Sequence, residues 1–204
     1  KDIDASALSG RPFEMSNGAT LVINAEGSDI KSGKYGLVNI SNDVSASVTI
    51  NGGNITGNLD SGSFIRVLDG GEKVSITLNN VTMTDTAEIN TASGTTTEMN
   101  RIINANVFTG ELNITVTGGT YTALAGFTFN SSSGEQKFDG VTINTDALAT
   151  EITSSNATFS NCTFNVGAVS ISSVPAGAVI VSYGGRGGRG NITLALPVGN
   201  YTAV

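Results

Sequence analysis

A seven-residue block that recurs six times constrains the fold of this chain more than any other feature. Each copy has an apolar residue, three positions that are mostly Gly, Asn or Asp, then Thr or Asn, a second apolar residue, and again Thr or Asn. Repetition of this kind is typical of a solenoid, in which each unit buries its apolar side only by stacking on the next unit. The copies occupy residues 50–56, 78–84, 116–122, 138–144, 159–165 and 196–202.

Short strands with alternating apolar residues surround each block. The clearest unit has strands at 64–68, 74–78 and 81–84, joined by turns at 69–73 and 79–80. Three such strands per unit, stacked so that equivalent strands pair in parallel, predict a parallel β-helix. Its turns tolerate Asn, because Asn adopts left-handed backbone angles at low cost, and stacked Asn side chains can hydrogen-bond from coil to coil.

The spacing of the blocks indicates the size of the coils. Successive blocks start 28, 38, 22, 21 and 37 residues apart. The shortest distances approximate the minimal coil, so the longer ones imply loops inserted between strands. Such insertions belong on the surface, where function is usually carried.

These patterns predict an all-β, single-domain, right-handed parallel β-helix over residues 1–204, with about six coils and three short strands per coil. Residues 1–36 are expected to form an irregular N-terminal cap or partial coil. Residues 37–204 are expected to form the coils, the sixth of which runs from about 179 to 202. An all-β sandwich is the competing architecture, but it predicts neither a fixed block nor an offset that matches position by position.

Charge and composition exclude several classes of partner. The chain has 10 basic and 17 acidic residues, a formal net charge of −7, and no histidine. Phosphate binding needs clustered Lys and Arg, so nucleic acid is not expected as a partner. No stretch approaches the ~20 apolar residues needed to span a bilayer. The acids are scattered, and calcium favours several carboxylates close together, so we expect no metal site and no cofactor.

The single cysteine lies in an apolar position of the block. Cys162 occupies the place that Val81 and Val141 hold in two other copies. One cysteine cannot form a disulfide within the chain. We therefore expect Cys162 to be a small buried hydrophobic residue rather than a reactive thiol.

Residues 140–146 and 154–167 resemble the pectin-degrading β-helix enzymes, the polygalacturonases especially. The resembling stretch spans about 28 residues, from 140 to 167, and implies that Asp146, in Asn144-Thr145-Asp146, corresponds to a catalytic acid of that family. The family has a second carboxylate pair where this chain has Ala168 and Val169. The resemblance to pectate lyases is one of fold only.

Catalysis by this chain is therefore not the favoured interpretation. Glycosidic hydrolysis generally needs two carboxylates that flank the bond. Glu151 is the nearest other carboxylate to Asp146. Asp146 and Glu151 are the catalytic candidates if the chain is a divergent polysaccharide lyase or glycoside hydrolase. A turn residue is the simpler interpretation of Asp146.

A glycine-rich run near the end of the chain offers a candidate ligand site. Arg186 and Arg189 lie among glycines in this run, which begins at Tyr183. Two guanidinium groups and one ring could bind the carboxylates or sulfates of an acidic glycan. A flexible turn explains the same residues without a ligand. The insertion at 85–99 could wall a groove, and Tyr35 is a further possible stacking residue.

The sequence favours a non-catalytic extracellular or cell-surface module, from a bacterial protein, that binds glycans or presents a surface to them. An acidic polysaccharide is the expected partner. A divergent enzyme is one alternative, and a purely structural or adhesin scaffold is another. We expect a secreted or surface-displayed protein whose leader has been removed, with further domains or a partner covering its C-terminal end.

Overall fold

Every regular element in the described part of the structure is a β-strand. No helix is present there, and hence none that is long and apolar enough to cross a membrane. The computed structural model describes residues 2–70, 73–87, 100–105, 107–123, 127–129, 133–145, 157–166, 169–174, 179–182, 192–195 and 202–203.

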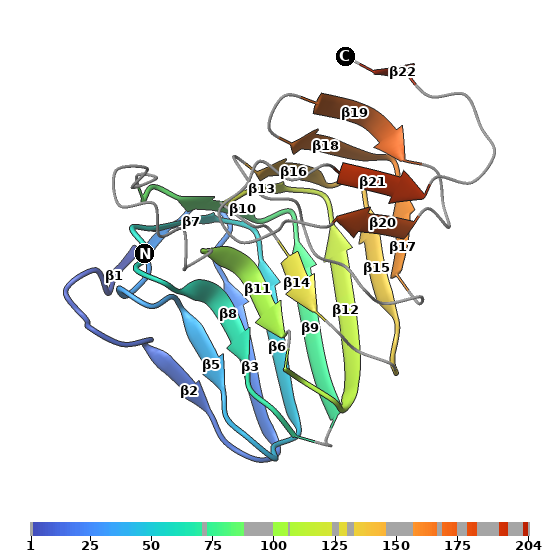
Figure 1. Ribbon diagram of the computed structural model, residues 1–204. Helices are drawn as coiled ribbons and strands as arrows, with labels where there is room; N and C mark the ends of the chain where they lie inside the picture. Colours follow the sequence, from blue (N-terminus) through green and yellow to red (C-terminus); the bar gives the residue numbers. More distant parts are fainter. Residues whose placement is uncertain are drawn as a thin grey trace.

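The chain passes through three sheets in turn, and each passage is called a coil here (Figure 1). Neighbouring strands within a sheet come from successive coils and pair in parallel. Sheet 1 consists of β2 (Phe13–Met15), β5 (Val38–Ile40), β8 (Ser63–Val67), β11 (Arg101–Ala105) and β14 (Phe127–Phe129).

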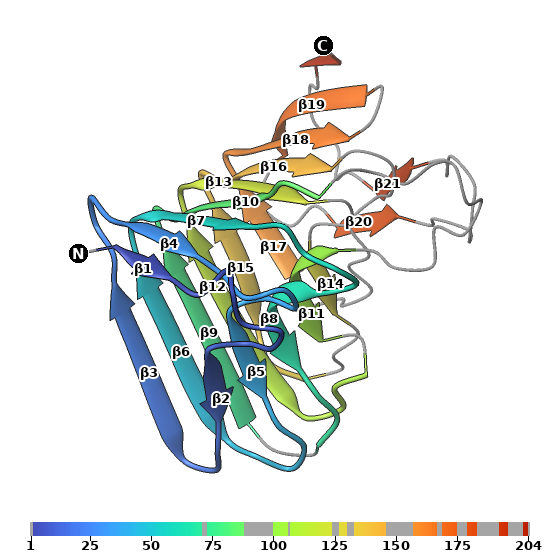
Figure 2. The same ribbon diagram turned by 90° about the vertical axis from the view of Figure 1, so that its left-hand side faces the viewer.

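The next two sheets follow the same order along the chain, and Figure 2 shows their strands side by side. Sheet 2 consists of β3 (Ala19–Asn24), β6 (Ala46–Asn51), β9 (Lys73–Asn79), β12 (Glu111–Thr117), β15 (Gln136–Asp139) and β17 (Ala157–Ser160). The parallel part of sheet 3 consists of β1 (Ile3–Asp4), β4 (Asp29–Lys31), β7 (Asn54–Gly57), β10 (Thr82–Asp85), β13 (Thr120–Ala123), β16 (Thr142–Thr145) and β18 (Cys162–Val166).

The first residues of five blocks align in sheet 2. Ile50 pairs with Leu78, which pairs with Val116. Phe138 pairs with both Val116 and Phe159. The number of residues between successive blocks therefore equals the offset between paired residues of neighbouring strands. The predicted parallel pairing is confirmed for these copies.

Left-handed residues form the turn from sheet 2 to sheet 3. The third position of the block has a positive φ in five copies, either as Asn or as Gly, which are the residues that adopt this conformation at least cost. The turn chemistry predicted for Asn is confirmed at Asn80, whose φ is 51°. Asp43, in another turn, has a similar φ of 54°. The five residues are Gly52, Asn80, Gly118, Gly140 and Asn161.

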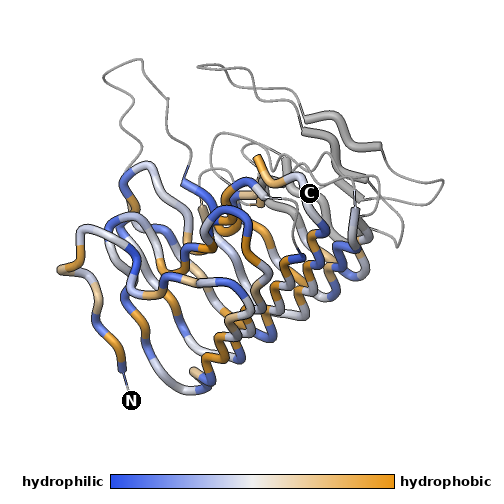
Figure 3. The backbone as a smooth tube through the Cα atoms, turned by 90° about the horizontal axis from the view of Figure 1, so that it is seen from below, coloured by the Kyte–Doolittle hydropathy of each residue, from blue (hydrophilic) through white to orange (hydrophobic). Residues whose placement is uncertain are grey.

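The apolar side chains fill the interior of the stack. Along β9 and β12 buried residues alternate with partly exposed ones, as expected for strands with one face inside. Figure 3 shows the same alternation of hydrophobic and hydrophilic residues along the coils. The interior becomes aromatic late in the chain, where Phe127, Phe138 and Phe159 are fully or almost fully buried.

The first 36 residues contain regular strands. Here β2, β3 and β4 provide one strand for each sheet, and they pair with β5, β6 and β7. The strand predicted at 21–24 lies within β3.

The sixth parallel coil predicted at 179–202 does not occur in the described strands of that region. Here β20 (Val179–Ser182) and β21 (Ile192–Ala195) pair with each other in antiparallel fashion. Before them, β19 (Val169–Val174) pairs antiparallel with β18, and β22 (Thr202–Ala203) pairs antiparallel with β19. Only residues 167–168 separate β18 from β19, and such a short connection suits a hairpin but not a parallel crossover.

Candidate functional site

The ligand and catalytic residues predicted from the sequence lie outside the described residues. This applies to the catalytic candidates Asp146 and Glu151, and to the glycan-binding candidates Tyr183, Arg186 and Arg189. The structure therefore leaves both predictions as they stand.

A cavity of about 710 Å³ lies at the corner where strands β4 and β7 of sheet 3 end. It is called the corner pocket here. Its wall combines hydroxyl, amide and charged side chains with a few apolar ones, a mixture that suits a polar ligand with some apolar surface. The lining residues are Ser6, Ala7, Leu8, Ser9, Ser32, Gly33, Lys34, Asn58, Leu59, Asp60 and Ala87.

An ion pair lies in the wall of the corner pocket. Lys34 Nζ is 2.7 Å from a carboxylate oxygen of Asp60, and both side chains are about half exposed to solvent. The hydrogen bond from Lys34 lowers the pKa of Asp60, and the same contact raises the pKa of Lys34. Lys34 Nζ also lies 5.7 Å from the ring centroid of Tyr35, whose side chain is exposed. Lys34, in the pocket wall, thus contacts both an opposite charge and an aromatic ring, although Tyr35 itself does not line the pocket.

A set of hydrogen bonds, called the brace here, connects Leu59 and Ala87 in the pocket wall with Asp85 and Asn100. The Asp85 carboxylate accepts hydrogen bonds from the backbone N–H groups of Leu59 and Ala87, at 3.0 and 3.1 Å. Asn100 donates to Asp85 at 2.8 Å and to the Leu59 carbonyl at 2.8 Å. Asp85 begins the insertion predicted at 85–99 and Asn100 follows it, and residues 88–99 lie outside the described part. The brace fixes both ends of this insertion beside the pocket.

Threonine and asparagine cover the outer side of sheet 3. Thr82, Thr120, Thr142 and Thr163 follow one another across four neighbouring strands. All four are partly exposed, while the residues between the two outward positions, such as Met83, are buried. A second row, two residues further along the strands, contains Thr56, Thr84, Thr122 and Asn144.

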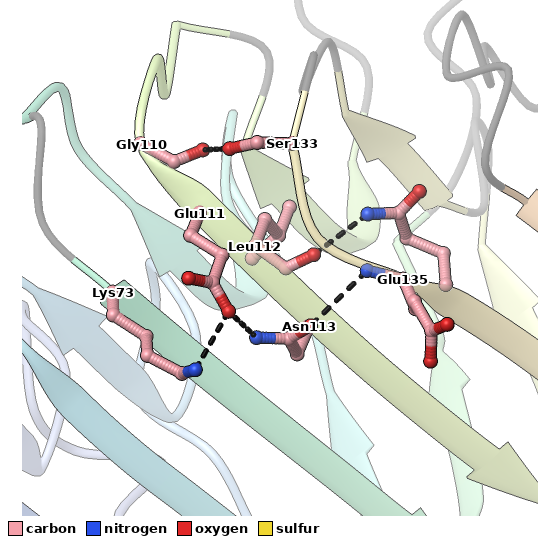
Figure 4. Close-up of polar contacts among 8 residues, drawn as sticks. Lys73, Gly110, Glu111, Leu112, Asn113, Ser133 and Glu135 are labelled. Atoms are coloured by element: carbon pink, nitrogen blue, oxygen red, sulfur yellow. Dashed lines mark hydrogen bonds and ion pairs between the residues drawn. The ribbon is translucent and has the colours of Figure 1, made fainter.

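The outer side of sheet 2 carries a chain of polar contacts that runs from coil to coil (Figure 4). Lys73 Nζ lies 2.6 Å from Glu111 Oε1, which also accepts a hydrogen bond from Asn113 Nδ2 at 2.8 Å. The Glu135 backbone N–H then donates to Asn113 Oδ1 at 3.1 Å. These groups satisfy one another, so they bind the coils together rather than offering a free site.

The thiol of Cys162 lies inside the stack, as predicted. Its side chain is buried, and burial raises the pKa of the thiol. Val81 and Val141, which hold the same position in other blocks, are also fully buried. A protonated buried thiol is a poor nucleophile, so this residue belongs to the core.

No group of three or more His, Cys, Asp or Glu side chains that could hold a metal ion occurs within the part of the chain that the structure describes. Comparisons with protein family models, with curated proteins and with solved structures found no match.

Sequence reasoning missed the Lys34–Asp60 pair, although a signal for it exists. The two residues are 26 positions apart, close to the spacing of the early coils, and the backbone N–H of Asp60 donates to the Lys34 carbonyl. Opposite charges one coil apart also form the contacts Lys31–Asp4 and Lys73–Glu111, whose backbones pair in register. The separation of Lys73 and Glu111 equals the 38-residue spacing of the second and third blocks, which would have predicted this contact. The separations of the other two pairs, 26 and 27 residues, only approximate the first block spacing of 28.

Proposed function

We propose that this chain is a non-catalytic, secreted or cell-surface module that binds glycans at the corner pocket. The observation that carries the proposal is the composition of that pocket, where Lys34, Asp60 and Asn58 supply donors and acceptors next to the exposed Tyr35 ring. The hydroxyl groups of a sugar can hydrogen-bond with these donors and acceptors, and its apolar ring face can stack on the Tyr35 ring.

The threonine and asparagine rows of sheet 3 support an extended ligand. Strands β4 and β7 end at the pocket, and their outward residues continue into rows of hydroxyl and amide groups. Such rows could follow successive sugars of a polysaccharide. The same flat surface would also serve a structural or adhesin scaffold, which differs from our proposal only in having no glycan ligand.

We also propose that the stacked coils form a single right-handed parallel β-helix. Parallel strands joined by a crossover are right-handed in about 98% of cases. A rigid stack of this kind would hold the pocket and the rows of sheet 3 in a fixed relation.

Titration of the protein with neutral and acidic oligosaccharides by calorimetry tests the glycan proposal. The variants Tyr35→Ala and Asp60→Asn should weaken binding by about tenfold each, because Asp60 lines the pocket and the Tyr35 ring lies next to Lys34 in its wall. Glu111→Gln is the matched control, since it breaks an equally exposed ion pair on sheet 2. Equal affinity in all variants, or no binding of any glycan, would contradict the proposed site.

A turnover assay on the same oligosaccharides tests the non-catalytic part. Unchanged chain length after long incubation is the expected result. Release of shorter products would contradict it and would direct attention to Asp146 and Glu151.

A further inference from the structure

The outward positions of sheet 3, from β7 to β16, carry neither a charged nor an aromatic side chain. Each of these strands has a buried residue between two outward ones, and Figure 2 shows the strands side by side. The outward residues, strand by strand, are Asn54 and Thr56, Thr82 and Thr84, Thr120 and Thr122, and Thr142 and Asn144. They form two rows in register, called the threonine array here, which present only hydroxyl, methyl and amide groups.

The outer side of sheet 2 differs, although it also contains threonines. A row of register partners there ends in a charged residue, in the order Thr49, Thr77, Thr115 and Lys137. The ion pairs Lys73–Glu111 and Lys137–Glu135 lie on the same side. Charged groups hold tightly bound hydration water. Sheet 2 therefore has a mixed, charged outer surface, whereas the threonine array is uncharged.

Most hydroxyl groups of the threonine array form no hydrogen bond within the described part of the chain. The exception is Thr122, whose Oγ1 accepts a hydrogen bond from Asn144 Nδ2 at 3.0 Å. The threonines without such a bond are Thr56, Thr82, Thr84, Thr120 and Thr142. Because threonine is branched at Cβ, its side chain is stiff about χ1. The array therefore holds free hydroxyl groups in nearly fixed positions.

The strands set the spacing of these hydroxyl groups. Neighbouring strands lie about 4.7–4.9 Å apart, and two residues along a strand span about 6.6 Å. In ice each water molecule forms four tetrahedral hydrogen bonds with O···O distances of about 2.75 Å. This geometry repeats every 4.5 Å or so in one direction and about every 7.3 Å perpendicular to it. The two sets of spacings thus agree to within about a tenth in both directions.

We propose that the threonine array binds the surface of ice. Its hydroxyl and amide groups hydrogen-bond water molecules at lattice positions, and its methyl groups fill the spaces between them. Ice is regular and uncharged, so a regular and uncharged surface is complementary to it. A rigid array loses little conformational freedom on binding, so many weak contacts act together. Thr163, the register partner of Thr142 on β18, extends the first row. The proposal does not rest on glycan binding at the corner pocket.

The growth of a single ice crystal in the protein solution tests this proposal. A protein adsorbed on ice stops growth below the melting temperature, so a gap opens between the temperatures of melting and of growth. We expect such a gap for the parent protein. Thr120→Lys should abolish it, because a long charged side chain in the middle of the first row holds the ice surface away. Thr84→Lys should do the same in the second row and decides the matter if Thr120→Lys does not fold.

Three controls separate the threonine array from other surfaces. Thr77→Lys makes the same change at a partly exposed threonine of sheet 2 and should leave the gap unchanged. Thermal unfolding midpoints show whether each lysine variant folds. Tyr35→Ala and Asp60→Asn alter the corner pocket and its neighbour, and should also leave the gap unchanged.

The outcomes distinguish this proposal from the glycan proposal. A gap that Thr84→Lys abolishes and Thr77→Lys preserves supports ice binding, whatever the affinity for glycans. Absence of a gap for the parent protein overturns ice binding alone. An equal gap in folded Thr84→Lys and Thr77→Lys, or loss of the gap in Tyr35→Ala, also overturns it.

Discussion

The early coils, from β2 to β10, have a ladder of stacked asparagines on their outside, whereas the late coils, from β11 to β18, have stacked aromatic rings in their interior in addition to outer polar contacts. Outside the early coils, Asn51 Nδ2 donates to Asn24 Oδ1 and Asn79 Nδ2 donates to Asn51 Oδ1, both at 2.8 Å. Inside the late coils, the rings of Phe138 and Phe159 are stacked with centroids 4.7 Å apart and planes 16° apart.

The asparagine ladder and the aromatic stack depend on the same strand spacing. Neighbouring strands lie about 4.7–4.9 Å apart, so identical side chains at equivalent positions of successive coils come into contact. An asparagine then meets an asparagine, and a ring stacks on a ring. The difference teaches that an in-register stack can be reinforced from outside by a polar ladder or from inside by aromatic contacts.

The largest effect is expected from removing a ring of the aromatic stack. Phe138 contacts Phe127 edge-on, with centroids 5.2 Å apart, as well as Phe159. Phe138→Ala should lower the free energy of unfolding by about 3–5 kcal/mol, through the cavity and the lost ring contacts. Ile50→Ala, at the equivalent position of an early coil, should cost less. Urea denaturation measures both, and equal losses would show that ring stacking adds nothing to apolar burial.

Two glycines at equivalent turns should differ in their tolerance of a side chain. Gly119 has φ 88°, and an added Cβ would overlap the Val81 carbonyl oxygen. Gly140 has φ 64°, but nothing lies within 4 Å of its added Cβ. Gly140→Ala should cost about 1–2 kcal/mol from backbone strain alone, and Gly119→Ala clearly more because the coils must separate locally. Thermal unfolding of the two variants compares them, and similar midpoints would refute the close approach at Gly119.

The asparagine ladder should show a smaller effect that depends on position. Asn51 takes part in two ladder hydrogen bonds, and Asn24 in one. Asn51→Ala should therefore cost about 1–2 kcal/mol and Asn24→Ala about half as much. Denaturant unfolding provides the measurement. A greater loss for Asn24→Ala would mean that the ladder does not bind the coils in this way.

The smallest effect concerns acid stability at the first ion pair. Hydrogen bonds from Ser6, and then from Lys31, lower the pKa of Asp4 from 3.8 to about 2. Because the folded pKa lies below the unfolded one, the contribution of Asp4 is complete above pH 3.8 and is lost as the pH falls through 2. The thermal unfolding midpoint falls as the pH is lowered from 3.8 to 2, and in Asp4→Asn this fall should be slightly smaller than in the parent protein. An unchanged pH profile would contradict the shift.

The sequence predicted the pairing of the strands best, because equivalent positions of successive blocks align in the sheet. Block spacing predicted which residues align, as the pairing of Ile50 with Leu78 and of Phe138 with Phe159 shows. It did not predict the antiparallel pairing of β18 with β19 or of β20 with β21, because a seven-residue pattern does not specify the partner of a strand. Residues 196–201 of the last block lie outside the described part of the chain. The short connection at 167–168 favours a hairpin instead.

The position of the corner pocket was harder to predict from the sequence than the pairing of the strands. The 26 residues between Lys34 and Asp60 only approximate the first block spacing of 28. The cavity depends on how loops pack and has no local sequence pattern. The arginines at 186 and 189 remain a prediction.

Distance measurement between two spin labels on sheet 3 tests the stacked register most directly. Lys31 and Asn144 are linked by register partners through Thr56, Thr84 and Thr122. Labels on Lys31→Cys and Asn144→Cys, in a Cys162→Val background, should report a backbone separation of about 19 Å, which is four strand spacings. A narrow distribution near that value would support the in-register stack. A clearly longer or broad distribution would contradict it.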